Sequence, residues 1–224
     1  MRFNSGIKNM LCSWSGGKDS CYAMMQAMQF GYQPKVLLNM LNENGKVSRS
    51  HGLPLEILKQ QAGQMRLPLV TIPTSWSDYE RNFIEILGKL KESYKLDYAV
   101  FGDIDLQPHR DWEEKVCEEV NIKAVLPLWK KNRKELMQEM LDCNIESMIV
   151  SCNTAMGEKY LGKILTKQLT DKLELTGIDP CGENGEFHTL VVNCPLFDRR
   201  ISLPAYKTQT YNDYCFINWK ILLL

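Results

Sequence analysis

The chain has no Cys-x-x-Cys pair among its 8 cysteines, and it has only 3 histidines in 224 residues. The usual ligand spacings of structural zinc sites and iron–sulfur clusters are therefore missing. No segment approaches the roughly 18 apolar residues that a membrane-spanning helix needs, and residues 1–6 contain no apolar core of a secretory signal. These absences predict a cytoplasmic protein with no membrane partner.

The chain also has no excess of either charge. Lys and Arg number 27, Asp and Glu number 27, and the formal net charge is 0. Proteins that bind nucleic acid usually gain affinity from surplus basic residues that neutralise phosphates, so we do not expect a nucleic acid partner. Hydrophobic residues make up 44% of the sequence, which is enough for a sizeable core in one large or two small domains.

Short apolar runs alternate with helix-like segments through the first half of the chain. We expect strands at residues 8–14, 36–41, 67–73, 97–102 and 124–126. Between them, apolar residues recur three or four positions apart, as in an amphipathic helix. Such alternation predicts a mostly parallel sheet covered by helices on both faces. We therefore predict an α/β, Rossmann-like domain over residues 1–125.

The pattern changes after about residue 125. The sequence predicts a helix around 136–141, a strand at 147–152, a helix at 162–175, a strand at 190–192 and a pairing partner for it at 198–203. This mixture indicates a smaller α+β substrate-binding domain over residues 126–205. Residues 206–224 end in Ile-Leu-Leu-Leu, and we expect them to form a C-terminal tail that docks on the core or on a partner.

A polar segment with two glycines, Ser15-Gly16-Gly17-Lys18-Asp19-Ser20, follows the first expected strand. The glycines let the backbone turn tightly and approach an anion, and the following helix offers unpaired N–H groups at its start. Lys18, Ser15 and Ser20 add side-chain donors, so a polyphosphate fits this loop. The spacing is not that of a Walker loop. A tight turn with a capped helix is the alternative interpretation.

Two aspartates are candidate ligands of Mg²⁺. Asp19 lies in the phosphate-binding turn, where a carboxylate would repel phosphate unless a divalent cation lay between them. Asp103 and Gly102 follow a buried strand, at the sheet edge where ligands bind in parallel α/β folds. The alternative for Asp19 is that it only stabilises the start of the helix.

Two further side chains are candidates for ligand contact. Arg110, together with Lys18, carries positive charge that would neutralise a departing pyrophosphate. Arg110 could equally be a surface residue beside Trp112. His51 lies in an expected loop that is open to ligand contact, although a lone loop histidine is often solvated.

The densest polar cluster of the chain is Gly182-Glu183-Asn184-Gly185-Glu186-Phe187-His188-Thr189. Its glycines can take a positive φ, so the loop can fold back and present Glu183, Asn184 and Glu186 together. Neighbouring carboxylates suit a cationic substrate, ammonium delivery or proton removal from an attacking amine. A hydrogen-bonded turn that leads into a strand is the alternative.

The Ser15–Ser20 loop resembles the SGGxDS loop of the PP-loop, or N-type, ATP pyrophosphatases. The chain as a whole closely resembles the diphthine–ammonia ligase family of these enzymes, over roughly residues 8–203. Besides the loop, the resemblance rests on Phe101–Ile104, His109-Arg110, Pro127–Trp129 and Gly177–Thr189.

This resemblance implies an adenine nucleotide alpha hydrolase-like first domain that uses ATP and Mg²⁺. It also implies a reaction in which a carboxylate is adenylated with loss of pyrophosphate, after which ammonia displaces AMP to give an amide. In the family the carboxylate is diphthine on elongation factor 2. The expected partners are therefore this carboxylate substrate and ammonium, and we also expect a homodimer.

The residues and the resemblance together define an expected site. Its catalytic members are Lys18, Asp19, Glu183 and Glu186. ATP is expected at Ser15, Gly16, Gly17, Lys18, Asp19, Ser20, Gly102 and Asp103, and Mg²⁺ at Asp19 and Asp103. The substrate is expected at His51, Arg110, Asn184, Phe187, His188 and Thr189. The quaternary ammonium group of diphthine is expected against an aromatic face such as Phe187 or Trp129.

Two other functions are compatible with the phosphate loop. A PP-loop tRNA-modifying enzyme would need a basic RNA-binding face, and the neutral charge argues against it. A noncatalytic ATP-binding sensor would bind nucleotide without turnover. The Glu183–Thr189 cluster argues against the sensor, because a sensor needs no second substrate cavity.

Overall fold

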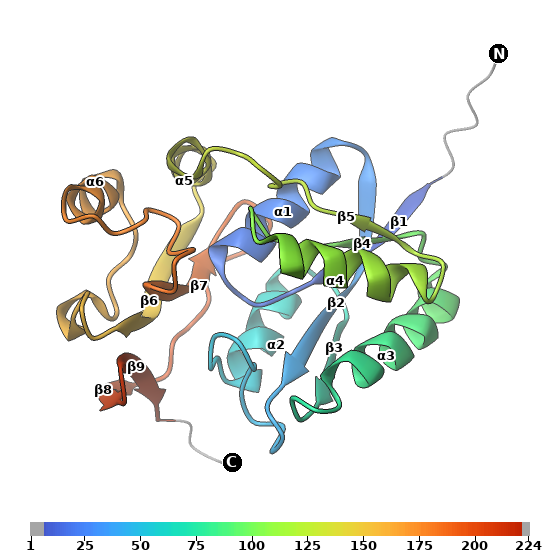
Figure 1. The fold of residues 1–224 in the computed structure, drawn as a ribbon, viewed down its shortest axis with the longest axis horizontal. Coiled ribbons are helices and arrows are strands. Elements are labelled where there is room, and N and C mark those ends of the chain that lie inside the picture. The colour runs from blue at the N-terminus through green and yellow to red at the C-terminus, as the bar shows by residue number, and fades with distance from the viewer. Residues whose placement is uncertain (1–6, 221–224) are drawn as a thin grey trace.

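The computed structural model describes residues 7–220. Residues 1–6, where we expected no secretory signal, and residues 221–224, the apolar end of the expected tail, lie outside the described residues. The first half contains β1 (Lys8–Ser13), α1 (Lys18–Gln29), β2 (Tyr32–Leu41), α2 (Leu55–Gln64), β3 (Leu69–Pro73), α3 (Tyr79–Tyr94), β4 (Tyr98–Val100), α4 (Gln107–Glu118) and β5 (Lys123–Val125). The second half contains α5 (Arg133–Asp142), β6 (Glu146–Asn153), a short 3-10 helix (Glu158–Tyr160), α6 (Lys167–Leu175), β7 (Phe187–Asn193), β8 (Tyr206–Tyr211) and β9 (Tyr214–Trp219). Figure 1 shows the two halves side by side as two lobes.

The sheet of the first lobe has five strands in the order β3-β2-β1-β4-β5, and every pair in it is parallel. The predicted α/β fold class is confirmed. From β1 the chain adds β2 and β3 on one side of the sheet and then β4 and β5 on the other, so the strand order reverses between β1 and β4. Open parallel sheets bind ligands at such a point, beyond the carboxyl ends of the strands. The residues that follow β1 and β4 are Ser15–Ser20 and Gly102–Asp103.

The sheet of the second lobe has four antiparallel strands in the order β7-β6-β9-β8. The expected C-terminal tail is wrong for residues 206–219, since they form the hairpin β8–β9. Strand β9 pairs with β6, with Cys152 opposite Cys215. Residues 206–219 therefore complete this sheet.

Two other expectations for the second lobe are also wrong. The helix expected at 162–175 begins only at Lys167, because Gly162 takes a φ of 77° and Ile164 forms a β-bridge with Met148. The segment 198–203 forms no strand. It contacts β7 through one backbone hydrogen bond, from Ile201 N–H to the Val192 carbonyl at 3.0 Å.

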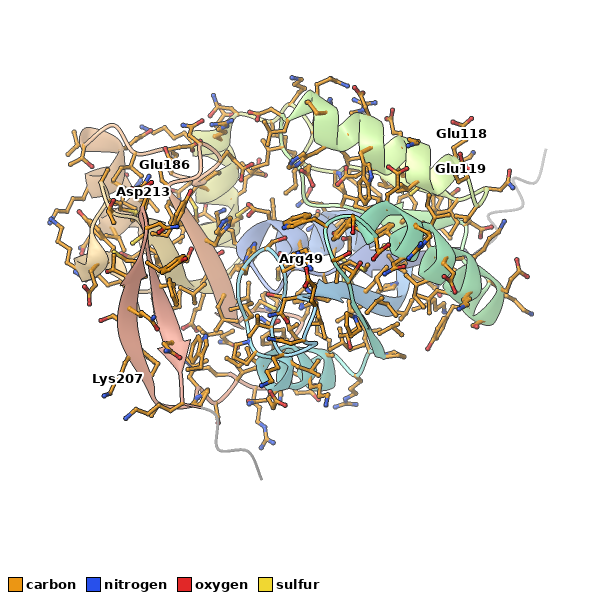
Figure 2. The ribbon with its side chains drawn as sticks, turned by 60° about the horizontal axis from the view of Figure 1, so that its bottom comes forward. Arg49, Glu118, Glu119, Glu186, Lys207 and Asp213 are labelled. Carbon is orange, nitrogen blue, oxygen red and sulfur yellow. The ribbon has the colours of Figure 1, made fainter. Side chains whose placement is uncertain are left out.

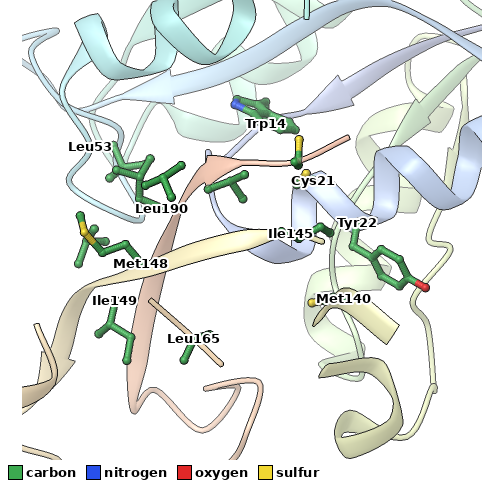
Figure 3. Close-up of a cluster of buried hydrophobic side chains, with 14 of the residues drawn as sticks. Trp14, Cys21, Tyr22, Leu53, Met140, Ile145, Met148, Ile149, Leu165 and Leu190 are labelled. Atoms are coloured by element: carbon green, nitrogen blue, oxygen red, sulfur yellow. The ribbon is translucent and has the colours of Figure 1, made fainter. Parts of the chain in front are cut away.

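One hydrophobic cluster joins the two lobes. Met10, Trp14 and Cys21 of the first lobe belong to the same buried cluster as Met148 and Leu190 of the second. In Figure 3, Leu190 of β7 lies toward Leu53 of the first lobe, and Ile145, just before β6, lies toward Tyr22 of α1. A separate cluster fills the other face of the parallel sheet, under α3 and α4. The shared core explains how the second lobe is held against the carboxyl edge of the parallel sheet.

Within residues 7–220, none of the helices combines the length and the apolar character needed to cross a membrane.

Candidate active site

The loop between β1 and α1 is shaped for an anion. Gly16 takes a φ of 86°, and Gly17 is the N-cap residue of α1, where no side chain caps the helix. At the start of the helix, the Gly17 N–H donates to Ser15 Oγ and the Lys18 N–H donates to Thr189 Oγ1, so the N–H groups of Asp19 and Ser20 are the ones left for an anion. Ser15 and Ser20 face each other across the loop, with their hydroxyl oxygens 3.0 Å apart. This geometry suits a phosphate group.

The second lobe is hydrogen-bonded directly to this loop. The backbone N–H of Lys18 donates to Thr189 Oγ1 at 3.1 Å. The N–H of Val191 donates to the Gly16 carbonyl at 2.9 Å. From α2, the side-chain amide of Gln61 donates to the carbonyls of both Gly16 and Val191, at 3.0 and 2.8 Å. Strand β7 therefore helps to set the geometry of the phosphate loop.

Gly102 allows the parallel sheet to approach the start of α1 closely. A Cβ atom at this position would lie 2.8 Å from both the Asp19 carbonyl carbon and the Ser20 nitrogen. These are backbone atoms, so they could not move aside without shifting the helix. Gly102 thus places the end of β4 against the phosphate loop.

A cavity of about 570 Å³ lies between the phosphate loop, the starts of α3 and α4, and the loop that precedes β7. This volume is typical of sites for small-molecule ligands. Eleven of the expected site residues line the cavity together: Ser15, Lys18, Asp19, Ser20, His51, Gly102, Asp103, Glu183, Phe187, His188 and Thr189. Gly16 and Gly17 shape the loop beneath it.

The ammonium group of Lys18 is buried in the wall of this cavity, and only 2% of the residue is exposed. It donates to both carboxylate oxygens of Asp19 at 2.9 Å and to the Cys181 carbonyl at 2.5 Å. Burial acts against the charge, but the attraction of Asp19 outweighs it and raises the pKa of Lys18. Lys18 therefore stays cationic and available to neutralise phosphate charge.

Two neutral histidines lie next to the phosphate loop. The rings of His51 and His188 have centroids 4.8 Å apart. Burial, together with the neighbouring His188, lowers the pKa of His51 to about 3. His51 Nδ1 donates to the Thr189 carbonyl at 2.8 Å, because a carbonyl can only accept, and Nε2 therefore remains an acceptor. His51 can orient a donor, but it does not supply positive charge near neutral pH.

Glu183 is the acidic residue of the Gly182–Thr189 loop that reaches the cavity. Burial raises the pKa of this carboxyl group to about 7, and the negative charge of Asp19 acts in the same direction. A carboxyl group that titrates near neutral pH suits proton transfer, because both protonation states are populated.

Asp103 lies in a hydrogen-bonded group of three. Its Oδ1 lies 2.7 Å from His109 Nδ1. Burial acts to raise the pKa of Asp103, but hydrogen bonds from His109 and Glu113 outweigh it and keep the pKa below its usual value. Burial in turn raises the pKa of Glu113 to about 10. At neutral pH Asp103 is therefore ionised and Glu113 is a neutral acid.

The donor set on the cavity wall fits Mg²⁺ in part. Among residues 7–220 there is no cluster of three or more His, Cys, Asp or Glu side chains arranged around a metal position. Mg²⁺, however, is commonly held by one or two carboxylates plus the phosphates of a nucleotide. Asp19 and Asp103 both line the cavity and could supply those carboxylates.

Two expected members of the site point elsewhere. The carboxylate of Glu186 is buried and accepts hydrogen bonds from the backbone N–H groups of Asp179 and Asn184, at 3.1 and 2.9 Å. The side chain of Asn184 accepts a hydrogen bond from Arg133 at 3.0 Å. Figure 2 shows Glu186 within the second lobe, away from Arg49 of the β2–α2 loop. Both side chains therefore hold the loop in shape and do not line the cavity.

Arg110 and Trp129 also lie away from the cavity. Arg110 pairs with Glu114 at 2.7 Å, one helical turn along α4. Its guanidinium lies 5.0 Å from the centroid of the Trp129 ring, and the Lys130 ammonium lies at the same distance from that ring. The structure thus agrees with the surface interpretation of Arg110, and Trp129 already has two cations near its ring.

Arg133 is a residue that the sequence reasoning missed. Its guanidinium binds both carboxylate oxygens of Asp105 at 2.8 Å and also pairs with Asp179. Asp105 follows β4 in the first lobe, whereas Asp179 begins the loop that contains Glu183. Arg133 therefore fastens that loop to the first lobe. No local signal marks this residue, because its partners are far apart in the sequence.

Aromatic residues at the other end of the cavity were also missed. We call Trp76, Tyr79, Phe83 and Trp112 the aromatic wall; all four line the cavity, as do Glu113 and His109. A signal was present in the sequence, because Trp76 and Tyr79 directly follow the expected strand at 67–73. Residues that follow parallel strands lie at the ligand-binding edge.

The sequence is similar to two family models that together span most of the chain. Residues 8–124 match the diphthamide synthase N-terminal domain, and residues 132–222 match the diphthamide synthase C-terminal domain. A solved structure described as a predicted subunit of tRNA methyltransferase from Methanocaldococcus jannaschii is 17% identical, with a TM-score of 0.45; it covers 87% of this chain and 100% of its own.

Curated relatives carry the same family name. The diphthine–ammonia ligases of Homo sapiens and Bos taurus are 31% and 30% identical, and each alignment covers 90% of this chain and 85% of the relative. The enzyme of the same name from Schizosaccharomyces pombe is 29% identical over 92% of this chain and 38% of its own length. The chain belongs to the diphthamide synthase family.

Proposed function

We propose that the protein is an ATP-dependent, AMP-forming ligase that converts the carboxylate of diphthine on elongation factor 2 into an amide. One observation supports this most strongly. The phosphate loop and the loop with Glu183 lie against one cavity, and Lys18 is hydrogen-bonded to both. A cavity of this kind can hold a nucleotide and a second substrate next to each other.

The reaction has two steps. A carboxylate oxygen of the substrate attacks the α-phosphorus of ATP, the bond between the α-phosphorus and the bridging oxygen breaks, and pyrophosphate leaves. The nitrogen lone pair of ammonia then attacks the acyl carbon, the bond to the AMP oxygen breaks, and the nitrogen loses a proton. The chain must therefore stabilise anionic phosphates in the first step and accept a proton in the second.

The cavity residues suit these requirements. Lys18, Asp19 and Ser20 at the start of α1 line the cavity, so the N–H groups of Asp19 and Ser20 and the Lys18 ammonium would stabilise the charge of the departing pyrophosphate. Asp19 and Asp103 would hold Mg²⁺, which neutralises phosphate charge when bound. Glu183, with its pKa of about 7, would accept the proton from the amine.

The expected surroundings of the enzyme follow from the same proposal. The partner is a protein that carries the carboxylate, and ammonium is the nitrogen donor. The rim of the cavity contains Trp76 and Leu106, two exposed apolar side chains that a protein surface could cover. A substrate on elongation factor 2 places the enzyme in the cytoplasm. We also propose that the protein forms a homodimer.

The test is to incubate the protein with ATP, Mg²⁺, ammonium and elongation factor 2 that carries diphthine. We expect AMP and pyrophosphate in equal amounts, together with the small mass decrease that marks conversion of an acid into an amide. Omission of ammonium should remove the amide. Glu183→Gln is the matched variant and should release little amide. AMP formation that depends on tRNA, or nucleotide binding without turnover, would contradict the proposal.

A further inference from the structure

The side chain of Gln61 on α2 is completely buried, with 0% of the residue exposed. Its Oε1 atom accepts a hydrogen bond from Trp14 Nε1 at 2.9 Å. Its Nε2 atom donates to the carbonyl of Gly16 at 3.0 Å and to the carbonyl of Val191 at 2.8 Å. A buried amide is costly unless its polar atoms are hydrogen-bonded, and here both amide hydrogens and the oxygen are used.

The partners of Gln61 fix the orientation of its amide. An indole N–H can only donate, so the oxygen of Gln61 faces Trp14. A carbonyl can only accept, so the nitrogen of Gln61 faces the two carbonyls. Figure 3 shows Trp14 in the buried cluster that the two lobes share. The amide of Gln61 is therefore a fixed pair of donors directed at the phosphate loop and at β7.

The Gly16 carbonyl is held on the side of the loop that faces away from the cavity. It accepts hydrogen bonds from Gln61 Nε2 at 3.0 Å and from the Val191 N–H at 2.9 Å. Gln61 and Val191 are both fully buried and lie outside the cavity lining. In a trans peptide the N–H points opposite to the carbonyl. The Gly17 N–H accordingly donates to the hydroxyl of Ser15, which lines the cavity, at 3.2 Å.

A peptide between two glycines can turn over at low cost. Gly16 has a φ of 86°, and neither Gly16 nor Gly17 has a Cβ atom that would restrict the turn. After such a turn the Gly16 carbonyl oxygen would point toward the cavity, where its partial negative charge would repel a phosphate. The Gly17 N–H would then face the donors of Gln61 and Val191, which would have lost their acceptor. The hydrogen bond from Gln61 therefore opposes the peptide orientation that excludes an anion.

We infer that Gln61 is a positioning residue that holds the Gly16–Gly17 peptide in the orientation that admits phosphate. This inference rests on the part of the proposed function in which the loop binds the phosphates of ATP. The same amide also binds Val191 of β7, so the phosphate-binding form of the loop depends on the docked second lobe. No local signal in the sequence marks Gln61, because its partners lie 45, 47 and 130 positions away.

Two variants of the full chain test this, with inorganic pyrophosphate and Mg²⁺ as the probe in calorimetry. Trp14→Phe removes the indole N–H but leaves Gln61 able to donate to both carbonyls. The double variant, Trp14→Phe with Gln61→Met, also removes the amide, so no buried indole N–H is left without its acceptor. We expect Trp14→Phe to bind pyrophosphate like the wild type. The double variant should bind it about tenfold more weakly, since only the fraction with the unturned peptide binds.

Amide hydrogen exchange then shows whether the effect is local. The Val191 N–H donates to the Gly16 carbonyl, so it loses its acceptor when the peptide turns over. It should exchange about tenfold faster in the double variant than in Trp14→Phe. The Ile149 N–H, which donates to the Lys163 carbonyl at 2.9 Å in the same lobe, is the control and should exchange at similar rates in both. Thermal unfolding checks that each variant is folded.

A crystal structure of the wild type with bound pyrophosphate tests the inference without any substitution. The Gly16 carbonyl should remain on Gln61 and Val191, and a carbonyl turned toward the pyrophosphate would overturn the inference. Equal pyrophosphate affinity in the two variants, or equal acceleration of the Val191 and Ile149 amides, would overturn it as well. A wild type that binds no pyrophosphate at this loop would contradict the proposed function itself, so the two failures can be told apart.

Discussion

The Lys18 ammonium and the Cys181 carbonyl oxygen, which lie 163 positions apart in the chain, are hydrogen-bonded at 2.5 Å. Lys18 belongs to the phosphate loop of the first lobe, and Cys181 belongs to the loop of the second lobe that carries Glu183. The bond makes the position of the Lys18 ammonium depend on the loop that contains Glu183. A movement of the Glu183 loop would therefore also move the Lys18 ammonium in the phosphate loop.

The first prediction concerns another hydrogen bond between the phosphate loop and the second lobe, from Lys18 N–H to Thr189 Oγ1 of β7. Thr189→Val keeps the shape of the side chain but leaves the buried N–H without its acceptor. We expect the free energy of unfolding to fall by about 1–3 kcal/mol, as for a buried donor that loses its partner. Urea denaturation measures this change. Thr189→Ser keeps the hydroxyl, and if it were destabilised as much as Thr189→Val, the hydrogen bond would not be the cause.

The second prediction concerns the close approach at Gly102. Gly102→Ala would place a Cβ atom 2.8 Å from backbone atoms of Asp19 and Ser20, so α1 must shift. We expect a loss of about 1–3 kcal/mol of stability from overpacking, together with weaker ATP binding in calorimetry. Gly88→Ala in α3 is the control, because its Cβ would make only an ordinary 3.5 Å contact with the Val120 side chain, and alanine favours a helix. Normal ATP affinity in Gly102→Ala would show that this contact does not shape the site.

The parallel sheet and the phosphate loop could be predicted because their signals are local. Each buried strand is a short apolar run, and the loop is six consecutive residues with their own chemistry. The Arg133 contacts could not be predicted in this way, since Asp105, Asp179 and Asn184 become neighbours only when the lobes meet. The aromatic wall likewise forms only where α3 and α4 begin side by side.

The hairpin β8–β9 was missed for a different reason. Every residue of β8 is exposed, so the strand lacks the apolar alternation that identifies a half-buried strand. Strand β9 does alternate, with Cys215 and Ile217 buried. The short apolar sequence at the end of the chain suggested a docking tail, but the backbone pairing with β6 determines the position of the hairpin. Edge strands that face solvent leave little trace in the sequence.

The third prediction separates two carboxylates that the sequence had grouped together. Glu186 accepts hydrogen bonds from two backbone N–H groups in its own loop, whereas Glu183 lines the cavity. Glu186→Gln should therefore lower the free energy of unfolding by about 1–3 kcal/mol, since charge-assisted hydrogen bonds are lost. Chemical denaturation measures this.

Glu183→Gln is the matched comparison for Glu186→Gln. We expect it to keep the thermal midpoint of the wild type near pH 5, where Glu183 is already largely neutral, and to reduce amide formation strongly. A stable Glu186→Gln protein that had lost only amide formation would show instead that Glu186 takes part in the chemistry.

The fourth prediction is the titration of Glu183. Burial and the negative charge of Asp19 raise its pKa from 4.5 to about 7, so the carboxyl group is protonated below that pH and ionised above it. Carbon NMR of the carboxyl group in the protein without nucleotide should show this midpoint. Asp19→Asn removes a negative neighbour, makes ionisation easier and should lower the midpoint. An unchanged midpoint would mean that Asp19 does not act on Glu183.

The same titration has a consequence for stability whose sign can be checked. Because the folded-state pKa of Glu183 lies above the value of 4.5 that it has without the fold, protonation favours the folded state. Its contribution is fully present below about pH 4.5 and is lost as the pH rises through about 7. Glu183→Gln cannot ionise, so its free energy of unfolding should exceed that of the wild type at pH 8 but not at pH 4. The measurement is the difference in free energy of unfolding between Glu183→Gln and the wild type. If this difference were the same at pH 4 and at pH 8, the pKa of Glu183 would not be raised by the fold, and the residue would be poorly suited to accept a proton from an attacking amine.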